Sequence, residues 1–317
     1  MDSRFNGRAV ARSWTEQPYH DDLTQMQGLL MEARSRTDDW HYEHVGELLW
    51  WYFMIACHLS PADHIRLWHN DFGSLVAFAM LGEDSALDLQ VLPEYEATAI
   101  GAEAVQWAQM RLDELRATVP DSWPRPLMCG TQESNEERIA FLEWHGFRAG
   151  AWAEVSMLCD LSDSLPDPSL PTGFSLRSAA DGFDITDRAG AQRDVWQPWP
   201  VGNVSAEEYA LMMRLPGYQP DLDVVAVAPD GAIAAYVNGW IDPVNRIGEF
   251  GPVGAREAYR RRGLTRAVLL EALRRMKKHG MNRVYITTGV SNVPARGLYS
   301  SVGFRVLNTY REYERVE

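Results

Sequence analysis

Three consecutive arginines followed by glycine form the segment whose residue types and spacing are best suited to chemistry. The segment reads Arg-Arg-Arg-Gly-Leu-Thr-Arg over residues 260–266. A helix that begins near Leu264 would expose unpaired N–H groups and partial positive charge at its first turn, where cations are unfavourable. An anion bound there removes the conflict, because Gly263 lets the backbone approach and the arginines neutralise the remaining charge. The spacing therefore predicts a binding turn for a diphosphate-sized ligand.

The charge balance makes this basic segment unusual. The chain of 317 residues has a formal net charge of −14, which argues against nonspecific binding to nucleic acid. Nine cationic residues nevertheless fall within 256–278, including both lysines of the chain. We therefore expect no nucleic-acid partner and a local anion site.

Other classes of protein and site find little support. The longest apolar run, 48–57, is about half as long as a membrane-spanning helix, and the first residues do not resemble a signal peptide. The three cysteines lack the spacing of a disulfide framework or a zinc site. His41 and His44 have helical i, i+3 spacing but no third ligand at a recognisable spacing. We expect a cytoplasmic protein with no membrane partner and no metal.

The elements that must position the basic turn follow from hydrophobic periodicity. The first half is predicted to hold a strand near 8–14, helices over 21–35, 43–57, 100–118 and 135–144, strands over 64–69, 74–81, 87–92 and 126–131, and a strand on either side of Gly150. The second half is predicted to hold strands over 175–177, 223–228, 233–241, 247–253, 283–288 and 306–313, and helices within 181–215 and over 264–279 and 292–301.

The two halves repeat one mixed α/β order. The segment SNEERIAFLEWHGF of 134–147 aligns without a gap on SNVPARGLYSSVGF of 291–304. A Pro- and Ser-rich stretch over 162–173 separates the halves and is typical of an exposed linker. The sequence therefore predicts one domain over 1–161, a linker over 162–173 and a second domain over 174–317.

The second half resembles the GNAT superfamily of acyl-CoA N-acyltransferases. Its first motif lies in FGPVGAREAYRRRGLTRAVLLEAL of 250–273, where Arg260, Gly263 and Thr265 take the places of the family's Gln/Arg-x-x-Gly-x-Gly/Ala. Thr265 departs from the small residue of the family. The second motif is matched by Asn292, Ala295, Leu298, Tyr299, Gly303 and Phe304.

The resemblance implies two tandem GNAT folds, each a mixed, mostly antiparallel sheet with a central splayed pair of strands. In the second domain this pair would be the strands around 252–255 and 285–288, with the pantetheine of acetyl-CoA inserted between them. The family's cofactor-binding residues correspond here to Val253, Gly254, Ala255, Arg260, Arg261, Arg262, Gly263, Leu264, Thr265, Arg266, Asn292, Ala295 and Tyr299.

The resemblance also implies direct transfer of an acetyl group to a primary amine, without a covalent enzyme intermediate. Tyr299 would protonate the leaving thiolate, since a phenol can donate a proton to it. Glu249 is the candidate base for the amine. Asn292 has a second role open to it as the N-cap of its helix.

The acceptor is not defined by the sequence. Trp196, Trp199 and Trp240 are predicted to form the acceptor wall, because the family builds this wall from its first helices and their loop. Small molecules and peptides both remain open as amine acceptors. A homodimer is also possible. A CoA-binding sensor or scaffold without turnover is the alternative, and the tandem arrangement also resembles mycothiol synthase.

The first domain is predicted to have lost cofactor binding. Its segment VLPEYEATAIG of 91–101 places Glu96, Thr98 and Ala99 where Arg, Arg and Gly are expected, and a carboxylate at this position repels phosphates. Leu142 stands where the second domain has Tyr299. We therefore expect a degenerate first domain and a catalytic second one.

Overall fold

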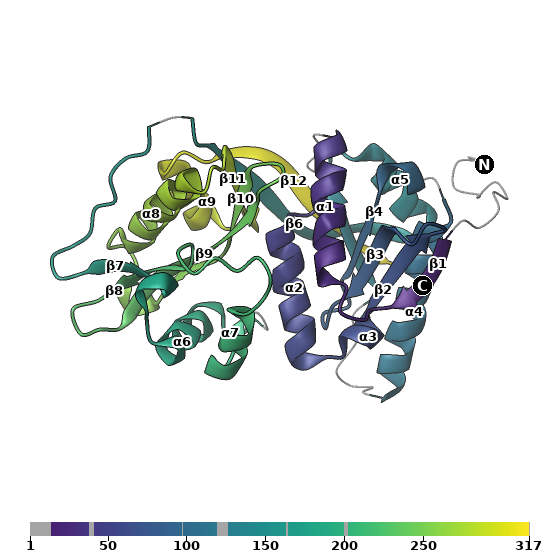
Figure 1. Cartoon of the computed structure of the whole chain (residues 1–317), viewed down its shortest axis with the longest axis horizontal. Coiled ribbons are helices and arrows are strands. Elements are labelled where there is room, and N and C mark those ends of the chain that lie inside the picture. Colours follow the sequence, from purple (N-terminus) through teal and green to yellow (C-terminus); the bar gives the residue numbers. More distant parts are fainter. Residues whose placement is uncertain are drawn as a thin grey trace. The chain divides into compact units, whose positions relative to one another are not determined.

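The chain divides into two compact units in a computed structural model that describes residues 14–37, 41–96, 98–118, 126–162, 164–199 and 202–316 (Figure 1). Unit 1 comprises Met1–His44, Trp50–Glu154 and Asn308–Glu317, and unit 2 comprises Val45–Leu49 and Val155–Leu307. The units follow contacts in space, so they differ from the predicted domains 1–161 and 174–317 near 45–49, over 155–173 and at the chain's C-terminus. The domain boundaries stay a prediction.

Unit 1 is built on an antiparallel sheet with the strand order β1-β2-β3-β4. Helix α4 packs on β3 and β4, and β5 joins β4 through a parallel bridge between Ala86 and Met128. The elements that lie wholly in this unit are β1 (Trp14–Pro18), α1 (Leu23–Thr37), α3 (Pro61–His64), β2 (Ile65–Asn70), β3 (Leu75–Leu81), β4 (Leu87–Val91), η1 (Pro93–Tyr95), α4 (Ile100–Thr118), β5 (Met128–Gln132) and α5 (Glu136–Trp144).

Unit 2 is built on a mixed sheet in the order β6-β11-β10-β9-β8-β7. Strand β10 pairs in parallel with β11 and antiparallel with β9. The elements that lie wholly in this unit are β7 (Ser175–Ser178), η2 (Ala179–Asp181), α6 (Ile185–Trp196), α7 (Ala206–Met212), β8 (Val224–Val227), β9 (Ile233–Asp242), β10 (Ile247–Ala255), η4 (Glu257–Tyr259), α8 (Leu264–Lys278), β11 (Arg283–Gly289) and α9 (Val293–Ser301). Three elements contribute residues to both units: α2 (Val45–His58), β6 (Phe147–Asp160) and β12 (Arg305–Arg315).

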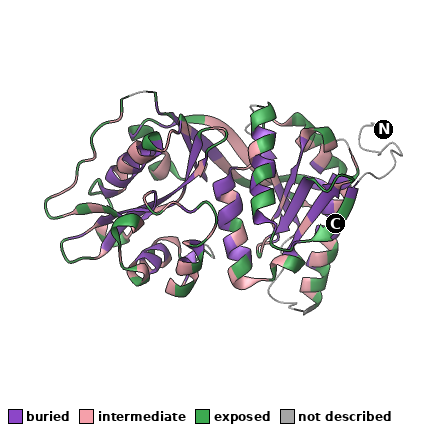
Figure 2. Ribbon diagram, viewed as in Figure 1, coloured by how far each residue is buried: buried purple, intermediate pink, exposed green. Residues whose placement is uncertain are grey.

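The sheet of unit 2 has an apolar layer on each face. Helix α8 covers one face, where Val224, Val237 and Phe250 belong to the main core. Helix α6 covers the other face, where Val225 and Tyr236 form a smaller cluster. Figure 2 shows the buried residues concentrated on the strands and on the inner sides of the helices. Because side chains alternate along a strand, neighbouring residues of β9 and β10 serve different faces.

Local sequence rules account for a turn and two helix starts of unit 2. In the turn between β8 and β9, the Asp230 carboxylate accepts a hydrogen bond from the Ala232 N–H (3.1 Å), and Gly231 has a φ of 92°. Ser205 and Glu208 form a capping box that starts α7. The Asn292 side chain accepts from the Ala295 N–H (3.3 Å) and so caps α9.

The predicted mixed α/β fold with a central splayed strand pair is confirmed. The helices expected within 181–215 are α6 and α7. One local expectation was wrong: Gly150 does not separate two strands but lies inside one continuous strand, β6. A side chain at Gly150 would lie 3.1 Å from the Glu312 carbonyl, so this glycine permits a close backbone approach without breaking the strand. The strand expected near 8–14 falls outside the described residues except at Trp14. Among the described helices, none is long and apolar enough to cross a membrane.

Candidate active site

The basic turn joins β10 to α8 through η4, as the sequence predicts. Gly263 is the N-cap of α8 in the left-handed conformation (φ 79°, ψ 3°), where a glycine is favoured and where no side chain caps the helix. The first intrahelical bond runs from the Ala267 N–H to the Gly263 carbonyl. The amides of Leu264, Thr265 and Arg266 therefore lie at the helix N-terminus, the position that binds anions in other proteins.

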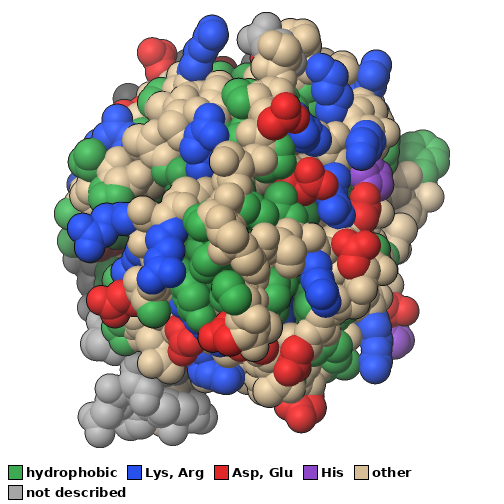
Figure 3. Space-filling model, turned by 90° about the vertical axis from the view of Figure 1, so that its left-hand side faces the viewer, with side chains coloured by type: hydrophobic (Ala, Val, Ile, Leu, Met, Phe, Trp, Pro, Cys, Tyr) green, Lys and Arg blue, Asp and Glu red, His purple; other side chains and the backbone are tan. Residues whose placement is uncertain are grey.

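The arginines of the turn are exposed at this N-terminus. Arg260 donates to the Ala255 carbonyl (3.1 Å), and the guanidinium of Arg262 lies 5.7 Å from the centre of the Tyr259 ring. Arg261 has a φ of 61°. On the side of the molecule that carries α8, β7 and β8, Figure 3 shows Lys and Arg side chains around an apolar area. The turn thus combines helix amides with exposed cations.

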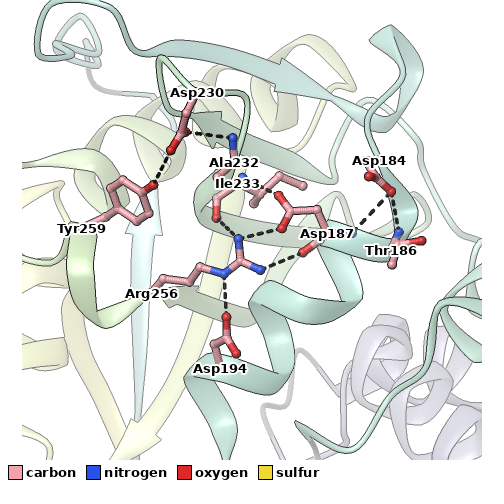
Figure 4. Close-up of polar contacts among 9 residues, drawn as sticks. All are labelled: Asp184, Thr186, Asp187, Asp194, Asp230, Ala232, Ile233, Arg256 and Tyr259. Carbon is pink, nitrogen blue, oxygen red and sulfur yellow. Dashed lines mark hydrogen bonds and ion pairs between the residues drawn. The ribbon is translucent and has the colours of Figure 1, made fainter.

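Arg256 belongs to the same basic segment but has a different role. Its guanidinium forms ion pairs with Asp187 (2.7 Å) and Asp194 (2.7 Å) of α6, and it donates to the Ile233 carbonyl (3.1 Å) (Figure 4). The Asp187 carboxylate also accepts from the Ile233 N–H (2.6 Å). Two carboxylates neutralise Arg256, so it ties the end of β10 to α6. In the sequence, the i, i+7 spacing of the two aspartates places them on one face of a helix, and this spacing is the signal that could have indicated the network.

Strands β10 and β11 separate just before the basic turn. Their parallel pairing runs from Ile247 opposite Arg283 to Phe250 opposite Ile286 and ends there. Further along β10, Val253, Gly254 and Ala255 pair with β9 on their other side, after a register shift. The β11 side of this segment thus has the geometry in which an extended ligand adds as a strand.

Tyr299 lies in α9 and belongs to the core on the α8 face. Its ring packs against Phe304, which in turn packs against Phe250, the last residue of β10 before the strands separate. Burial raises the pKa of Tyr299 to about 12. The phenol is therefore protonated near neutral pH and is a proton donor there.

Glu249 faces the opposite side of the sheet. It lies directly across from Trp240 on β9, so the two side chains share a face, while the neighbouring Phe250 points into the α8 core. Glu249 is 1% exposed. The start of α2 covers it, because a methyl group at Gly46 would collide with the carboxylate and lie 2.7 Å from the Cβ of Trp240.

The three tryptophans predicted as an acceptor wall occupy different environments. Trp240 is 1% exposed and donates to the Gly251 carbonyl (2.8 Å). Trp196 packs against the cluster around Tyr236, and Trp199 is 57% exposed. Trp240 is thus the tryptophan that the structure places beside Glu249.

In unit 1, β4 and β5 are the counterparts of the splayed strands β10 and β11, and the side chain of Arg138 lies between them. Helices α4 and α8 begin 164 positions apart (264 − 100), and the same offset relates Leu89 to Val253 (253 − 89). The Leu89 carbonyl accepts a hydrogen bond from Arg138 (3.1 Å). Arg138 lies in α5 at the place of Ala295 in α9, because the N-caps of these helices are 157 positions apart (292 − 135). Its guanidinium also contacts Cys129 of β5 (3.8 Å), so it spans both strands.

Glu96 takes the place of Arg260 by the same offset, and Tyr42 donates to its carboxylate (3.1 Å). Unit 1 therefore has an acidic turn and an arginine between its strands.

Comparison with known proteins agrees with this geometry. Residues 190–304 match the acetyltransferase (GNAT) family. A mycothiol acetyltransferase of Arthrobacter sp. (strain FB24) is 26% identical over 240 residues, covering 73% of this chain and 71% of that protein. A mycothiol acetyltransferase of Salinispora arenicola (strain CNS-205) is 24% identical over 273 residues, covering 81% of this chain and 82% of that protein.

Solved structures share the fold. A GCN5-related N-acetyltransferase from Sphaerobacter thermophilus superposes with a TM-score of 0.64 at 20% identity, covering 96% of each chain. A tandem GNAT protein from the clavulanic acid biosynthesis pathway also has a TM-score of 0.64, at 15% identity, covering 96% of this chain and 99% of that one. Enzymes of this family use acetyl-CoA and an amine acceptor. The splayed strands and the basic turn lie within residues 190–304, so the region that matches the acetyltransferase (GNAT) family also holds this geometry, and the match and the curated relatives indicate an acyltransferase.

Proposed function

We propose that the second domain, 174–317, transfers the acetyl group of acetyl-CoA to a primary amine and that the first domain is not catalytic. The observation that carries this proposal is the contrast between the two splayed strand pairs. In unit 2 the segment Val253–Ala255 leaves β11 and leads into a basic turn, whereas in unit 1 Arg138 binds the Leu89 carbonyl and Glu96 replaces a cation.

The residues of unit 2 fit acetyl-CoA. The helix amides of the turn, the exposed arginines 260–262 and the half-buried Arg266 would hold the diphosphate, and the backbone of Val253 and Ala255 would pair with the pantetheine. Asn292 is the N-cap of α9 and Ala295 lies in its first turn, where the second motif of the family contributes to cofactor binding. When bound, acetyl-CoA supplies an activated thioester carbonyl.

The chain's own residues then handle protons on both sides of the sheet. Glu249, on the α6 face, would take the proton that the amine must lose, directly or through water. Tyr299, on the α8 face and protonated at neutral pH, would donate a proton to the thiolate that leaves. The amine attacks directly, without a covalent enzyme intermediate.

Calorimetric titration of the full chain with CoA tests the cofactor half of the proposal. We expect saturable binding to one site per chain. Release of CoA thiol from acetyl-CoA in a panel of primary amines, including amino acids, polyamines, amino sugars and peptides, tests the enzymatic half. Absence of saturable binding would refute the proposal, and saturable binding without turnover on any amine would favour a CoA-binding sensor.

A second candidate function concerns the acceptor. The curated relatives cited above carry the name mycothiol acetyltransferase and align over most of both chains. We therefore propose a mycothiol precursor that bears a free amine as one acceptor to include in the panel. Turnover on this amine far above all others would select it, and turnover on unrelated amines alone would reject it.

Two further expectations accompany the proposal. A cytoplasmic location and a homodimer both remain predictions, which cell fractionation and light scattering would test.

A further inference from the structure

A fully buried ion pair joins α6 to Asp223, on the face of the sheet of unit 2 that also carries Glu249. The Nε of Arg188 in α6 is 3.1 Å from the Asp223 carboxylate, and both side chains have no exposed surface. The second carboxylate oxygen accepts from the hydroxyls of Tyr209 (2.6 Å) and Tyr218 (2.9 Å). Asp223 thus binds three donors, from α6, from α7 and from the segment that follows α7.

Burying this ion pair has a high desolvation cost for a contact that only stabilises the core. Removing two charges from water costs several kcal/mol per ion in typical proteins, and apolar replacements of buried pairs are often neutral or stabilising. The guanidinium of Arg188 is also enclosed, since it lies 3.9 Å from the centre of the Tyr236 ring. A role in fixing geometry explains the pair better than a role in stability alone.

Direct contacts connect the pair to the candidate base. The ring of Tyr218 meets Trp240 edge to face, with ring centres 6.3 Å apart and an interplanar angle of 72°. Trp240 lies opposite Glu249 in the strand register and donates to the Gly251 carbonyl, next to the point where β10 leaves β11. The same ring carries the hydroxyl that donates to Asp223 (2.9 Å), so this hydrogen bond restrains its orientation.

We propose that Asp223 and Tyr218 are positioning residues that set the orientation of Trp240 and thereby the acceptor side of the site beside Glu249. The inference rests on the proposed function for its kinetic consequence. Its structural part, the dependence of Trp240 on the Tyr218 hydroxyl, stands independently.

Tyr209 provides a matched control. Tyr209→Phe and Tyr218→Phe each remove one hydroxyl that donates to the same carboxylate oxygen, and of these two rings Tyr218 is the one that pairs with Trp240 among the described ring contacts. Asp223→Asn is less suitable, because it would leave the guanidinium of Arg188 buried without its counter-charge.

The first measurement is ¹⁹F NMR of the full chain labelled with 5-fluorotryptophan. The Trp240 resonance is assigned as the one that disappears in Trp240→Phe. We expect Tyr218→Phe to shift or broaden this resonance and Tyr209→Phe to leave it in place. An unchanged resonance in Tyr218→Phe, or equal changes in both variants, would overturn the proposal whether or not the protein turns over.

The second measurement is steady-state kinetics with the most active amine of the panel. We expect Tyr218→Phe to raise the KM for the amine about fivefold, the equivalent of one net hydrogen bond, with the KM for acetyl-CoA unchanged. Tyr209→Phe should match the wild type in both constants. A rise in the KM for acetyl-CoA instead would refute the assignment to the acceptor side. Failure to bind CoA at all would refute the proposed function and leave the NMR result to decide this inference.

Discussion

Introducing an arginine into unit 2 at the position that corresponds to Arg138 of unit 1, in the variant Ala295→Arg, should block the cofactor site. In unit 1, Arg138 reaches from the first turn of α5 to the Leu89 carbonyl of β4 and contacts β5. Its counterpart in α9 is Ala295, and the counterpart of Leu89 is Val253. In Ala295→Arg, we therefore expect the guanidinium to bind the Val253 carbonyl and to fill the space between β10 and β11.

The magnitude follows from the backbone groups that would be lost to the ligand. Two hydrogen bonds, to Val253 and Ala255, are each worth about 1 kcal/mol net, so their loss weakens CoA binding about 30-fold. Steric exclusion of the pantetheine adds to this loss. We thus expect at least about 30-fold weaker binding of CoA to Ala295→Arg by calorimetry.

Two variants control for charge and for the other unit. Gly297→Arg adds the same charge to α9 at an exposed position where a Cβ meets no atom within 4 Å, and it should bind CoA like the wild type. Arg138→Ala should also leave the affinity of the full chain unchanged and create no second site, because Glu96 remains. Wild-type affinity in a folded Ala295→Arg variant, or an equal loss in Gly297→Arg, would refute the reasoning.

Three further predictions concern the turn, the proton donor and a buried carboxyl group. Arg261→Ala with Arg262→Ala should weaken CoA binding about tenfold and reduce its salt dependence, because both side chains are exposed and form no ion pair among the described contacts. Calorimetry at two ionic strengths measures both effects, and unchanged affinity would show that these arginines do not bind CoA. Tyr299→Phe should lower kcat about 100-fold with little change in the KM for acetyl-CoA, and equal kcat would exclude the phenol as proton donor. Burial raises the pKa of Asp88 from 3.8 to about 6, so the stability that its protonated form contributes is lost as pH rises from about 4 to about 6. Asp88→Asn should therefore gain up to about 3 kcal/mol relative to the wild type between pH 4 and pH 7.5 in urea unfolding, and a pH-independent difference would contradict the shift.

Local rules made much of the fold predictable from the sequence. The turn at Asp230 and Gly231, the N-cap at Asn292 and the left-handed Gly263 each depend on the conformational and hydrogen-bonding preferences of one or two residues. The elements they delimit lie within a few residues of the predicted ranges. Within 181–215 the sequence predicted helices without their bounds, and the structure places them at α6 and α7.

Residue types and spacings along the chain were enough to predict the order of elements, the basic turn and the resemblance to the GNAT superfamily, because these features depend on neighbours in the sequence. Which charges can meet a ligand depends instead on the three-dimensional fold. Arg256 and Arg262 belong to the same basic segment, yet the fold brings two carboxylates to Arg256 and leaves Arg262 exposed. It likewise places Arg138 on the Leu89 carbonyl and buries Arg188 against Asp223. Such partners lie far apart in the sequence, and the electrostatic role of an arginine depends on its distance to them in space.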